Sequence, residues 1–372
     1  MKIAIVYDRV NKTGGAERIL AALHDIWPDA PLYTAVYSPK GAPWVKNWKI
    51  IPSFLQLFPL ARSHHELYPW ATSFAFESFS FDSYDVVLSV TSAEAKSIIT
   101  KPKTLHICYC LTPTRYLWSG VEEYRKDLGG MIFIPPFSSL VQKTLRRLRR
   151  WDLISAKRPD YYIAISNHVK NRIETYYNEK SISVIYPPLD MSVFVPGRTH
   201  EKGAYDLVVS RFVGYKRLDV VIEAYNRLGL PLVVVGSGRS EYALRSRAKK
   251  NIRFVTRYLT DRELVGYYQK CRAFVFAGDE DFGLVASEAQ ACGKSVLAYI
   301  NSGISEIVVD GLTGILYDKQ TVDSFILALR KLHSGTFSPK ACRENARRFS
   351  QGKFMKEMKE NVEFLYKKHS IL

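Results

Sequence analysis

Two glutamates, Glu280 and Glu288, stand eight positions apart in the segment GDEDFGLVASEA. Between them a glycine, Gly283, separates an acidic loop from residues with helical periodicity. Carboxylates accept hydrogen bonds from neighbouring hydroxyls, and the first backbone N–H groups of a helix, here those of Phe282, Gly283 and Leu284, can receive a hydroxyl or an anion. The spacing indicates a ligand rich in diols. Capping of the helix by acidic residues is the structural alternative.

Two cations lie in a second loop, SRFVGYKRLD, that also follows an apolar run. Arg211 and Lys216 are five positions apart, so both can reach one site at the start of the following helix. A guanidinium and an ammonium at a helix end suit a diphosphate and can neutralise a departing phosphate. Either residue taken alone could equally be a solvated surface charge. Because these cations can act without a metal, we expect no metal ion, although residues 279–281 match a D-x-D pattern.

Two glycine pairs could allow a phosphate to approach the backbone. Gly14 and Gly15 lie in KTGGAER, which lacks both the complete dinucleotide fingerprint and the lysine of a P-loop. Gly236 and Gly238 flank Ser237 after another apolar run. Each pair alone is weak evidence, because turns commonly use glycine.

Short apolar runs alternate with helical patterns along the chain, which predicts parallel sheets covered on both faces. The strand-like runs are residues 2–7, 85–90, 106–110, 161–165, 182–186, 207–210, 231–235, 253–255, 273–276 and 295–298. The clearest helical patterns are residues 16–26, 219–228 and 354–368. A polar span at 187–204 separates two α/β series. We therefore predict two domains, at residues 1–190 and 205–350, with a ligand cleft between the ends of their strands.

The composition limits the class of protein. The chain has 372 residues and a formal net charge of +17, so acidic partners are expected, whether nucleic acid, anionic lipid or a phosphorylated small molecule. No segment reaches the roughly 18 to 20 apolar residues of a membrane span. Asp8 interrupts the first apolar run, which we interpret as a buried strand rather than an export signal. The five cysteines form no metal-binding pattern, so we expect reduced thiols, no structural metal and a cytoplasmic protein.

The combination of motifs resembles the retaining GT-B glycosyltransferases of glycosyltransferase family 4, and most of all the bacterial mannosyltransferase-like branch that builds O-antigen and other surface polysaccharides. The segments that carry the resemblance are GGAER, AISNHVKNRI, VIYPPLD, SRFVGYKRLD, VVVGSGRSE, EDFGLVASEA and DGLTGILYD. The likeness extends over nearly the whole chain. It implies two Rossmann-like domains, with a C-terminal helix, residues 351–372, that packs back on the first domain.

The resemblance also implies roles for the residues above. Glu288 would bind the nucleotide ribose, and Glu280 would contact hydroxyls of the donor sugar. Arg211 and Lys216 would hold the donor diphosphate, with Gly15 approaching it from the first domain. The backbone amides of residues 282–284 would bind the sugar or phosphate.

Three further implications concern the base, the mechanism and the cofactor. The region of Arg257, Tyr258 and Leu259 would border the nucleotide base. Relatives usually retain the anomeric configuration and use no metal, so no cofactor is expected. Transfer with retention would proceed by front-face attack, in which the departing phosphate takes the proton of the acceptor.

The sequence departs from the family pattern at two positions. Relatives commonly have C-H-T-P-x-R-Y where this chain has CLTPTRY, so Leu111 replaces a histidine that lies beside the donor sugar. Ser92 replaces a second common histidine. We hypothesise that Leu111 faces the methyl group of a 6-deoxy sugar, the alternatives being that another group takes over or that activity is reduced. Arg115 and Tyr116 would lie on the first-domain side of the cleft.

Residues 140–153, LVQKTLRRLRRWDL, combine an apolar stripe with basic residues around the remaining surface. The stripe consists of Val141, Leu145, Leu148 and Trp151. Basic amphipathic helices bind anionic membranes, whereas a packed surface helix with a solvated basic side is the alternative of equal weight.

The sequence as a whole predicts a glycosyltransferase that moves a sugar, mannose or a 6-deoxy or amino sugar, from a nucleotide diphosphate donor. The acceptor would be an oligosaccharide or a polyprenyl-diphosphate-linked glycan at the inner face of a bacterial membrane, with no nucleic acid as partner. The alternatives are a sugar-nucleotide epimerase, a nucleic-acid-binding protein and a catalytically weakened partner subunit.

Overall fold

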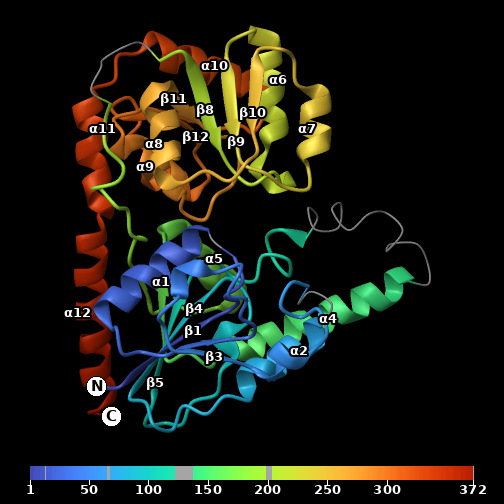
Figure 1. Cartoon of the computed structure of the whole chain (residues 1–372), viewed down its shortest axis with the longest axis vertical. Helices are drawn as coiled ribbons and strands as arrows, with labels where there is room; N and C mark the ends of the chain where they lie inside the picture. Colours follow the sequence, from blue (N-terminus) through green and yellow to red (C-terminus); the bar gives the residue numbers. More distant parts are fainter. Residues whose placement is uncertain (13, 65–67, 122–136, 198–202, 372) are drawn as a thin grey trace. The chain divides into compact units, whose positions relative to one another are not determined.

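The computed structural model describes residues 1–12, 14–64, 68–121, 137–197 and 203–371. Their contacts divide the chain into two compact units (Figure 1). Unit 1 contains Met1–Tyr186 together with Phe354–Leu372, and unit 2 contains Pro187–Lys353. The second unit therefore begins at the first proline of the predicted linker. Residues 198–202 of that linker lie outside the described ranges.

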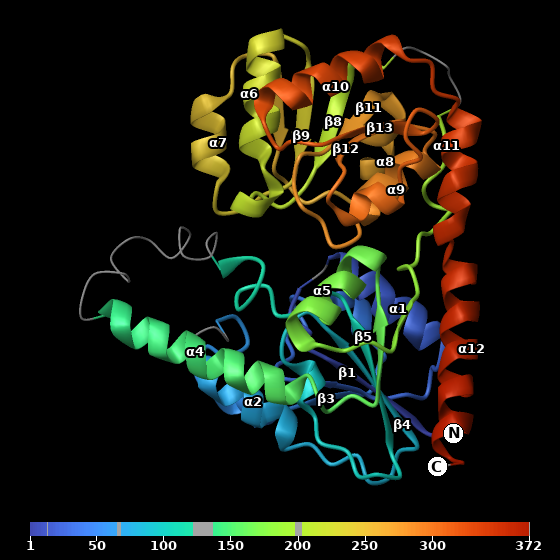
Figure 2. The ribbon, with the colours of Figure 1, turned by 180° about the vertical axis from the view of Figure 1, so that it is seen from behind.

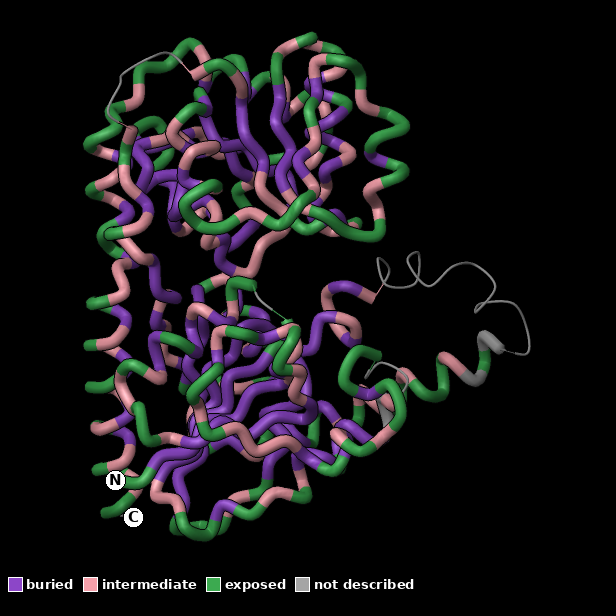
Figure 3. Tube along the Cα trace, in the orientation of Figure 1, coloured by how far each residue is buried: buried purple, intermediate pink, exposed green. Residues whose placement is uncertain are grey.

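Unit 1 is built on a seven-stranded sheet with the order β3-β2-β1-β4-β5-β6-β7, in which every strand pairs parallel to its neighbours. Apart from β3 and the partly buried β7, its strands are largely or wholly buried, because the apolar runs have no polar alternation (Figure 3). The strands are β1 (Ile3–Tyr7), β2 (Leu32–Thr34), β3 (Ile50–Pro52), β4 (Val86–Thr91), β5 (Leu105–Cys110), β6 (Tyr161–Ala164) and β7 (Ile182–Val184).

The helices of unit 1 connect these strands. They are α1 (Gly15–Ile26), α2 (Pro69–Glu77), α4 (Phe137–Ser155) and α5 (Asn167–Tyr177), with the 3₁₀ turns η1 (Pro43–Val45), η2 (Phe54–Leu57) and η4 (Ala95–Ser97). The last helix, α12 (Gln351–His369), returns to this unit (Figure 1). The ring of Phe354 packs 6.0 Å from that of Tyr109 on β5, and His369 Nε2 lies 2.8 Å from the carbonyl of Pro102.

Unit 2 contains a six-stranded parallel sheet with the order β10-β9-β8-β11-β12-β13. The strands are β8 (Tyr205–Val209), β9 (Leu232–Val235), β10 (Ile252–Val255), β11 (Cys271–Val275), β12 (Val296–Tyr299) and β13 (Gly314–Tyr317). The two units are thus both α/β with parallel sheets, as the alternating apolar runs predicted.

The helices of unit 2 are α6 (Leu218–Leu228), α7 (Glu241–Arg247), α8 (Asp261–Lys270), α9 (Leu284–Ala291), α10 (Val322–Ser334) and α11 (Pro339–Ala346), with the turns η6 (Gly214–Lys216), η7 (Gly303–Glu306) and η8 (Arg347–Phe349). Helix α6 packs against α10, and α9 against α11 (Figures 1 and 2). The core between α6, α10 and the sheet is apolar and includes Val221, Tyr225, Val234 and Phe325. All five cysteines are buried, free thiols.

Candidate functional site

The centre of the unit 2 sheet is a topological switch point between β8 and β11. From β8 the chain winds outward through β9 to β10, and from β11 it winds in the other direction through β12 to β13. In open α/β sheets, ligands bind beyond the carboxyl ends of the strands at such a point, because the loops there diverge. The loop after β8 carries Arg211 and Lys216, and the loop after β11 carries Glu280. The fold therefore places three predicted site residues on the two loops that flank the switch point.

Close backbone packing joins these two loops. A Cβ atom on Gly278 would lie 2.6 Å from the Cα of Lys216 and 2.7 Å from its carbonyl oxygen, so only glycine fits without displacement of the backbone. The N–H of Asp279 points to the carbonyl of Tyr215 at 3.4 Å. The loop after β11 thus rests directly on the turn η6 that presents Lys216.

Lys216 and Glu280 form an ion pair across this contact. Their side chains are only 7% and 17% exposed, so the pair lies below the surface while water can still reach it. The Lys216 ammonium also lies 4.8 Å from the ring centroid of Tyr215 and 5.6 Å from that of Phe276. Aromatic faces and a carboxylate therefore hold this cation in one place at the end of the sheet.

Arg211 approaches the same group of residues through Tyr215. Its guanidinium donates a hydrogen bond to the Tyr215 hydroxyl at 2.8 Å, while the ring of that tyrosine faces Lys216. Arg211 is exposed and Lys216 is buried. Tyr215, which the sequence analysis did not single out, therefore links the two predicted cations.

The loop after β9 supports the backbone beside Arg211. Gly236 and Gly238 have φ angles of +133° and +156°. A Cβ atom on Gly236 would lie 1.8 Å from the carbonyl oxygen of Ser210, and one on Gly238 would lie 2.5 Å from that of Phe212. The N–H of Phe212 also donates to the carbonyl of Ser237 at 2.8 Å. The GSG motif therefore serves close backbone packing in this structure.

A third loop, after β12, fixes the backbone of Glu280. The N–H of Glu280 donates to Ser302 Oγ at 3.1 Å, and the N–H of Gly303 donates to the carbonyl of Glu280 at 2.8 Å. Ser302 also accepts from the N–H of Ile304 at the start of η7. Neither Ser302 nor Gly303 carried a recognisable sequence signal, because their roles depend on contact with a loop more than twenty residues away.

Gly283 starts helix α9 in a conformation that favours glycine. Its φ angle is +97°, and a Cβ atom there would lie 2.3 Å from the side chain of Ile304. The preceding Phe282 is buried, with its ring 5.2 Å from that of Phe349. The first turn of α9, beginning at Leu284, contains no acidic side chain. The N-terminus of α9 therefore keeps the positive end of its dipole beside the acidic loop.

Glu288 is a buried carboxylate on α9, with 3% of its surface exposed. It accepts a hydrogen bond from the hydroxyl of Tyr268 on α8 at 2.8 Å, and the same hydroxyl lies 3.1 Å from the carbonyl of Val285. Tyr268 was missed by the sequence analysis, because nothing in the local sequence of α8 shows which face meets α9. The hydroxyl holds one oxygen of Glu288 in a defined position.

Tyr258 and Leu259 lie in the loop between β10 and α8. Tyr258 is 76% exposed, and Leu259 is half-buried. The end of this loop is fixed by a capping box between Thr260 and Glu263. Hydrogen bonds from Thr260 and from Arg257 lower the pKa of Glu263 to about 2. The Tyr258 ring is thus held on a structured loop and is accessible for stacking.

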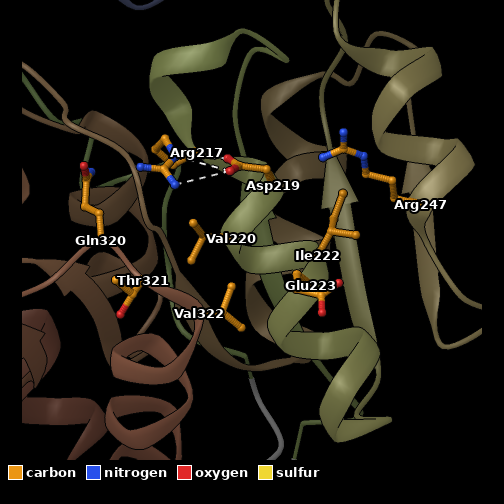
Figure 4. A pocket seen from close by; sticks show the side chains of 9 residues that line it. All are labelled: Arg217, Asp219, Val220, Ile222, Glu223, Arg247, Gln320, Thr321 and Val322. Atoms are coloured by element: carbon orange, nitrogen blue, oxygen red, sulfur yellow. Dashed lines mark hydrogen bonds and ion pairs between the residues drawn. The ribbon is translucent and has the colours of Figure 1, made fainter.

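A hollow of about 290 Å³ in unit 2 is lined mainly by residues at the starts of α6 and α10 (Figure 4). Arg217 turns toward Asp219 there, with Nε 3.1 Å from Oδ1. Gln320 borders the hollow and donates to the carbonyl of Ala277 at 2.9 Å, one residue before Gly278. None of the predicted site residues lines this hollow. The predicted site residues of unit 2 therefore point to the switch point, and not to this hollow, as the candidate site.

The predicted residues of unit 1 lie at the ends of its own strands. Gly15 is the first residue of α1, after β1. Leu111 directly follows β5 and is 8% exposed, and its N–H donates to the carbonyl of Thr91 at 2.8 Å. Arg115 is also buried, and its carbonyl accepts from the N–H of Gly120 at 2.8 Å.

A polar cluster at the switch point of unit 1, between β1 and β4, was missed by the sequence analysis. Arg9 pairs with Glu94 at 2.5 Å, and the Tyr116 hydroxyl donates to Glu94 at 2.7 Å. Asp8 accepts from the N–H of Ser92 at 2.8 Å. Burial and the neighbouring Glu94 raise the pKa of Tyr116 well above its ordinary value. Ser92, which is itself exposed, thus contributes its backbone N–H to a network whose carboxylates, Asp8 and Glu94, are buried.

Glu17, next to the glycines of GGAER, is a second residue that the sequence analysis left aside. It is 5% exposed and accepts from the Tyr7 hydroxyl at 3.2 Å. Burial raises the pKa of Glu17 above its ordinary value, and hydrogen bonds from the backbone N–H groups of Glu17 and Gly14 oppose that shift. Within the described ranges, no cluster of three or more His, Cys, Asp or Glu residues could hold a metal ion.

Comparison with known proteins identifies a family model that matches the region of unit 2 described above. Residues 195–349, which include Arg211, Lys216, Glu280 and Glu288, match the family model described as "Glycosyl transferases group 1". Two solved structures share the architecture at 16% identity, and each comparison covers 98% of this chain and 99% of the other. They are Anabaena HepE in complex with UDP and glucose, with a TM-score of 0.71, and the sucrose-phosphate synthase of Thermosynechococcus elongatus, with a TM-score of 0.72.

The fold is GT-B. Curated relatives of this GT-B chain include an uncharacterized glycosyltransferase of Methanocaldococcus jannaschii, 28% identical over 199 residues that make up 52% of this chain and 55% of the relative. A D-inositol 3-phosphate glycosyltransferase of Kribbella flavida is 31% identical over 200 residues, covering 46% of this chain and 47% of the relative. The chain thus spans about half the length of the curated relatives it matches.

Proposed function

We propose that this GT-B chain transfers a glycosyl group from a nucleotide diphosphate sugar to a glycan or lipid-linked acceptor. The observation that carries the proposal is the Lys216–Glu280 pair at the switch point of unit 2, inside the region that matches the glycosyltransferase family model. A cation for the diphosphate and a carboxylate for sugar hydroxyls stand side by side, as a bound sugar diphosphate requires.

Each residue of the site has a chemical role in this proposal. Lys216 and Arg211 bind the diphosphate and neutralise the charge that develops on the departing phosphate. Glu280 accepts hydrogen bonds from hydroxyls of the donor sugar. Glu288, held by Tyr268, accepts from the ribose, and the Tyr258 ring stacks against the base.

The diphosphate and Glu280 compete for the same ammonium group. Lys216 is paired with Glu280, so the donor has to exchange this carboxylate for its phosphate oxygens. Release of Glu280 then leaves a carboxylate beside the sugar, where it can accept from hydroxyls. The ion pair therefore couples binding of the diphosphate to positioning of the sugar.

The finer parts of the proposal concern donor, stereochemistry and acceptor. HepE was solved with UDP and with UDP-glucose, which makes UDP sugars a natural first donor to test beside GDP-mannose and dTDP-linked 6-deoxy sugars. We propose metal-independent transfer with retention, as in family 4 enzymes. The acceptor would belong to bacterial polysaccharide assembly, O-antigen included, on the cytoplasmic side of the membrane. Within the described residues, no helix has the length and apolarity that a bilayer span requires.

The buried Leu111 bears on donor choice. An apolar side chain at this position favours a sugar whose C6 carries a methyl group instead of a hydroxyl. Turnover of a 6-deoxy donor should exceed that of its 6-hydroxy counterpart with wild-type enzyme, and a Leu111→His variant should narrow the difference. A wild-type preference for the hydroxylated donor would contradict this role.

The decisive experiment combines binding with product analysis. Thermal unfolding is first measured with GDP, UDP and dTDP sugars, since a ligand at one hundred times its Kd stabilises the folded state by about 2.7 kcal/mol. The best donor is then incubated with and without oligosaccharide acceptors, in the presence of EDTA. Lys216→Ala should abolish the stabilisation, and Lys319→Ala, which removes an exposed lysine of the same unit, should preserve it.

Two outcomes would refute the proposal. Absence of stabilisation by every nucleotide sugar would remove the donor site. Conversion of the donor to an isomeric sugar nucleotide, without any need for an acceptor, would identify an epimerase instead. Formation of a glycosylated acceptor with the donor's anomeric configuration is the expected result.

A further inference from the structure

Helix α4 of unit 1 carries an unusual concentration of positive charge. Residues 143–158 contain seven lysines or arginines and one acidic residue, in a chain whose net charge is +17. The acidic residue, Asp152, has a side chain only 1% exposed and pairs with the equally buried Lys96 at 2.6 Å. This segment therefore presents no negative charge to the solvent.

Contacts with the body of unit 1 determine which side of α4 faces inward. Asp152 accepts from Trp118 Nε1 at 2.7 Å, and Arg149 Nε donates to the carbonyl of Leu117 at 2.7 Å. The apolar residues that the sequence analysis placed on one stripe, Val141, Leu145, Leu148 and Trp151, are all half-buried.

The opposite side of the helix follows from the helical period. Four exposed residues lie there and form what we call the α4 basic face: Lys143, Arg146, Arg147 and Arg150. Arg149 points inward and does not belong to this face. The basic residues other than Arg149 thus lie on the side of α4 opposite the apolar stripe.

Exposed apolar side chains accompany this charge. Ile154 is 62% exposed and Leu153 is 39% exposed, and the helical period places both on the outward side of α4. Helix α2 packs beside α4, because Glu77 binds Trp151 Nε1 at 3.3 Å and Arg158 at 2.6 Å. Phe74, one turn before Glu77 on α2, is 59% exposed. The two neighbouring helices α2 and α4 therefore both present exposed large apolar side chains, Phe74 and Ile154. Figure 3 shows exposed positions along α4.

We infer that the α4 basic face, with Ile154 and Phe74, docks on the surface of an anionic lipid bilayer. Lysine and arginine near such a surface are attracted to lipid headgroups, and aliphatic or aromatic side chains beside them can enter the boundary of the acyl chains. The inference extends the membrane-side part of the proposed function, but it does not depend on the transfer reaction.

A second basic segment, in unit 2, shows why charge alone is not the argument. Arg239, Arg247, Lys249 and Lys250 are exposed and cluster in sequence around α7. The large apolar side chain exposed among them is Tyr242, with no exposed Leu, Ile or Phe. Since this cluster has similar charge without the aliphatic groups, it supplies a matched control.

The test measures binding of the full chain to vesicles without any nucleotide. Vesicles of phosphatidylcholine are compared with an equal mixture of phosphatidylcholine and phosphatidylglycerol in a flotation assay over a series of salt concentrations. We expect binding to the anionic vesicles only. Changing Lys143, Arg146, Arg147 and Arg150 together to Gln should weaken it at least tenfold, because each basic residue near the surface contributes about fivefold.

Two further variants separate the contribution of the α4 charges from that of the apolar side chains to vesicle binding. The control with Gln at positions 239, 247, 249 and 250 loses the same formal charge and should bind vesicles as wild type does. Changing Ile154 and Phe74 to Ser should preserve binding at low salt and remove the part that survives at high salt, where electrostatic attraction is screened. Circular dichroism and thermal unfolding establish that each variant is folded.

Three results would overturn the inference. The first is wild-type binding to vesicles that does not depend on phosphatidylglycerol. The second is an equal loss of vesicle binding in the two charge variants. The third is binding to generic DNA or RNA that is as tight as binding to the anionic vesicles and depends on the same α4 residues. Stabilisation by a nucleotide sugar is measured in the same variants. Loss of vesicle binding with intact donor stabilisation would leave the proposed transfer reaction standing, so the two proposals can fail separately.

Discussion

Replacing Glu280 with Gln should tighten the binding of a free nucleoside diphosphate while it impairs sugar transfer. The carboxylate of Glu280 pairs with the Lys216 ammonium, so a diphosphate that binds Lys216 has to displace it. Gln keeps the size of the side chain but carries no charge. The variant therefore removes a competitor for Lys216 and, with it, a strong acceptor for sugar hydroxyls.

The expected change in nucleotide affinity follows from how exposed the Lys216–Glu280 ion pair is. Two unit charges about 4 Å apart attract by about 4 kcal/mol at an effective dielectric constant of 20. With 7% and 17% of the two side chains exposed, water screens part of this attraction. The net value should then be close to the 1.5 to 3 kcal/mol of a charge-assisted hydrogen bond. If about half of it opposes nucleotide binding, Kd for UDP or GDP should fall roughly tenfold.

Isothermal titration of the nucleoside diphosphate that best stabilises the wild-type chain measures this change directly. Glu344→Gln is the matched control, because it removes an exposed carboxylate of unit 2 that pairs with Arg347. The transfer rate of Glu280→Gln should fall at least tenfold, whereas that of the control should not change. Unchanged or weaker nucleotide binding by a folded Glu280→Gln variant would refute the competition between diphosphate and carboxylate.

Three other substitutions test the supporting structure. Tyr268→Phe removes the donor to the buried Glu288, so nucleotide affinity should fall about tenfold in titration and the free energy of unfolding by about 1 to 2 kcal/mol in urea; unchanged affinity would show that the hydroxyl does not position the carboxylate. Gly278→Ala forces a Cβ atom against the backbone of Lys216, so thermal unfolding should shift to lower temperature together with loss of nucleotide binding, and a stable variant with normal affinity would contradict the close packing. Burial raises the pKa of Glu17, which means that the folded state loses stability as pH rises through that pKa. Denaturant unfolding should therefore show that the Glu17→Gln variant is as stable as wild type at about pH 4, near the ordinary pKa of the residue, and more stable than wild type at pH 7. Equal stability of the two proteins at both pH values would count against the raised pKa of Glu17.

The sequence predicted the central strands of both sheets because buried parallel strands are uninterrupted apolar runs. The strands β2, β3 and β13 were missed, although β7, β9 and β10 are equally short and were predicted. Strand β3 ends in a proline and β13 begins with a glycine, and both residues usually mark turns. The helix at the C-terminus was visible as a pattern, but its assignment to unit 1 depends on contacts such as that of Phe354 with Tyr109, which no local pattern encodes.

The chemistry of the site was partly visible in the sequence. Glu280 and Lys216 could be singled out because each follows a strand and has a side chain suited to a sugar diphosphate. Ser302 and Tyr268 could not, because they act through neighbours that are distant in sequence and that only the folded chain brings together. Tyr215 lies within the predicted loop, but no local pattern shows that its hydroxyl meets Arg211. The orientation of helix α4 likewise depends on a contact between residues that are distant in sequence, because the buried pair of Asp152 with Lys96 determines which side of the helix faces inward.

Unit 1 is assembled from two stretches of the chain that flank unit 2, with α12 joining it after the whole of unit 2 has been synthesised. On the ribosome, the first six parallel strands and β7 emerge long before the segment that covers Tyr109 and whose Lys368 lies over the ring of Tyr161. Completion of unit 1 therefore waits until the residues from Phe354 onward have been translated. A stop codon before Phe354 would destabilise unit 1, which is translated first, and leave unit 2 complete.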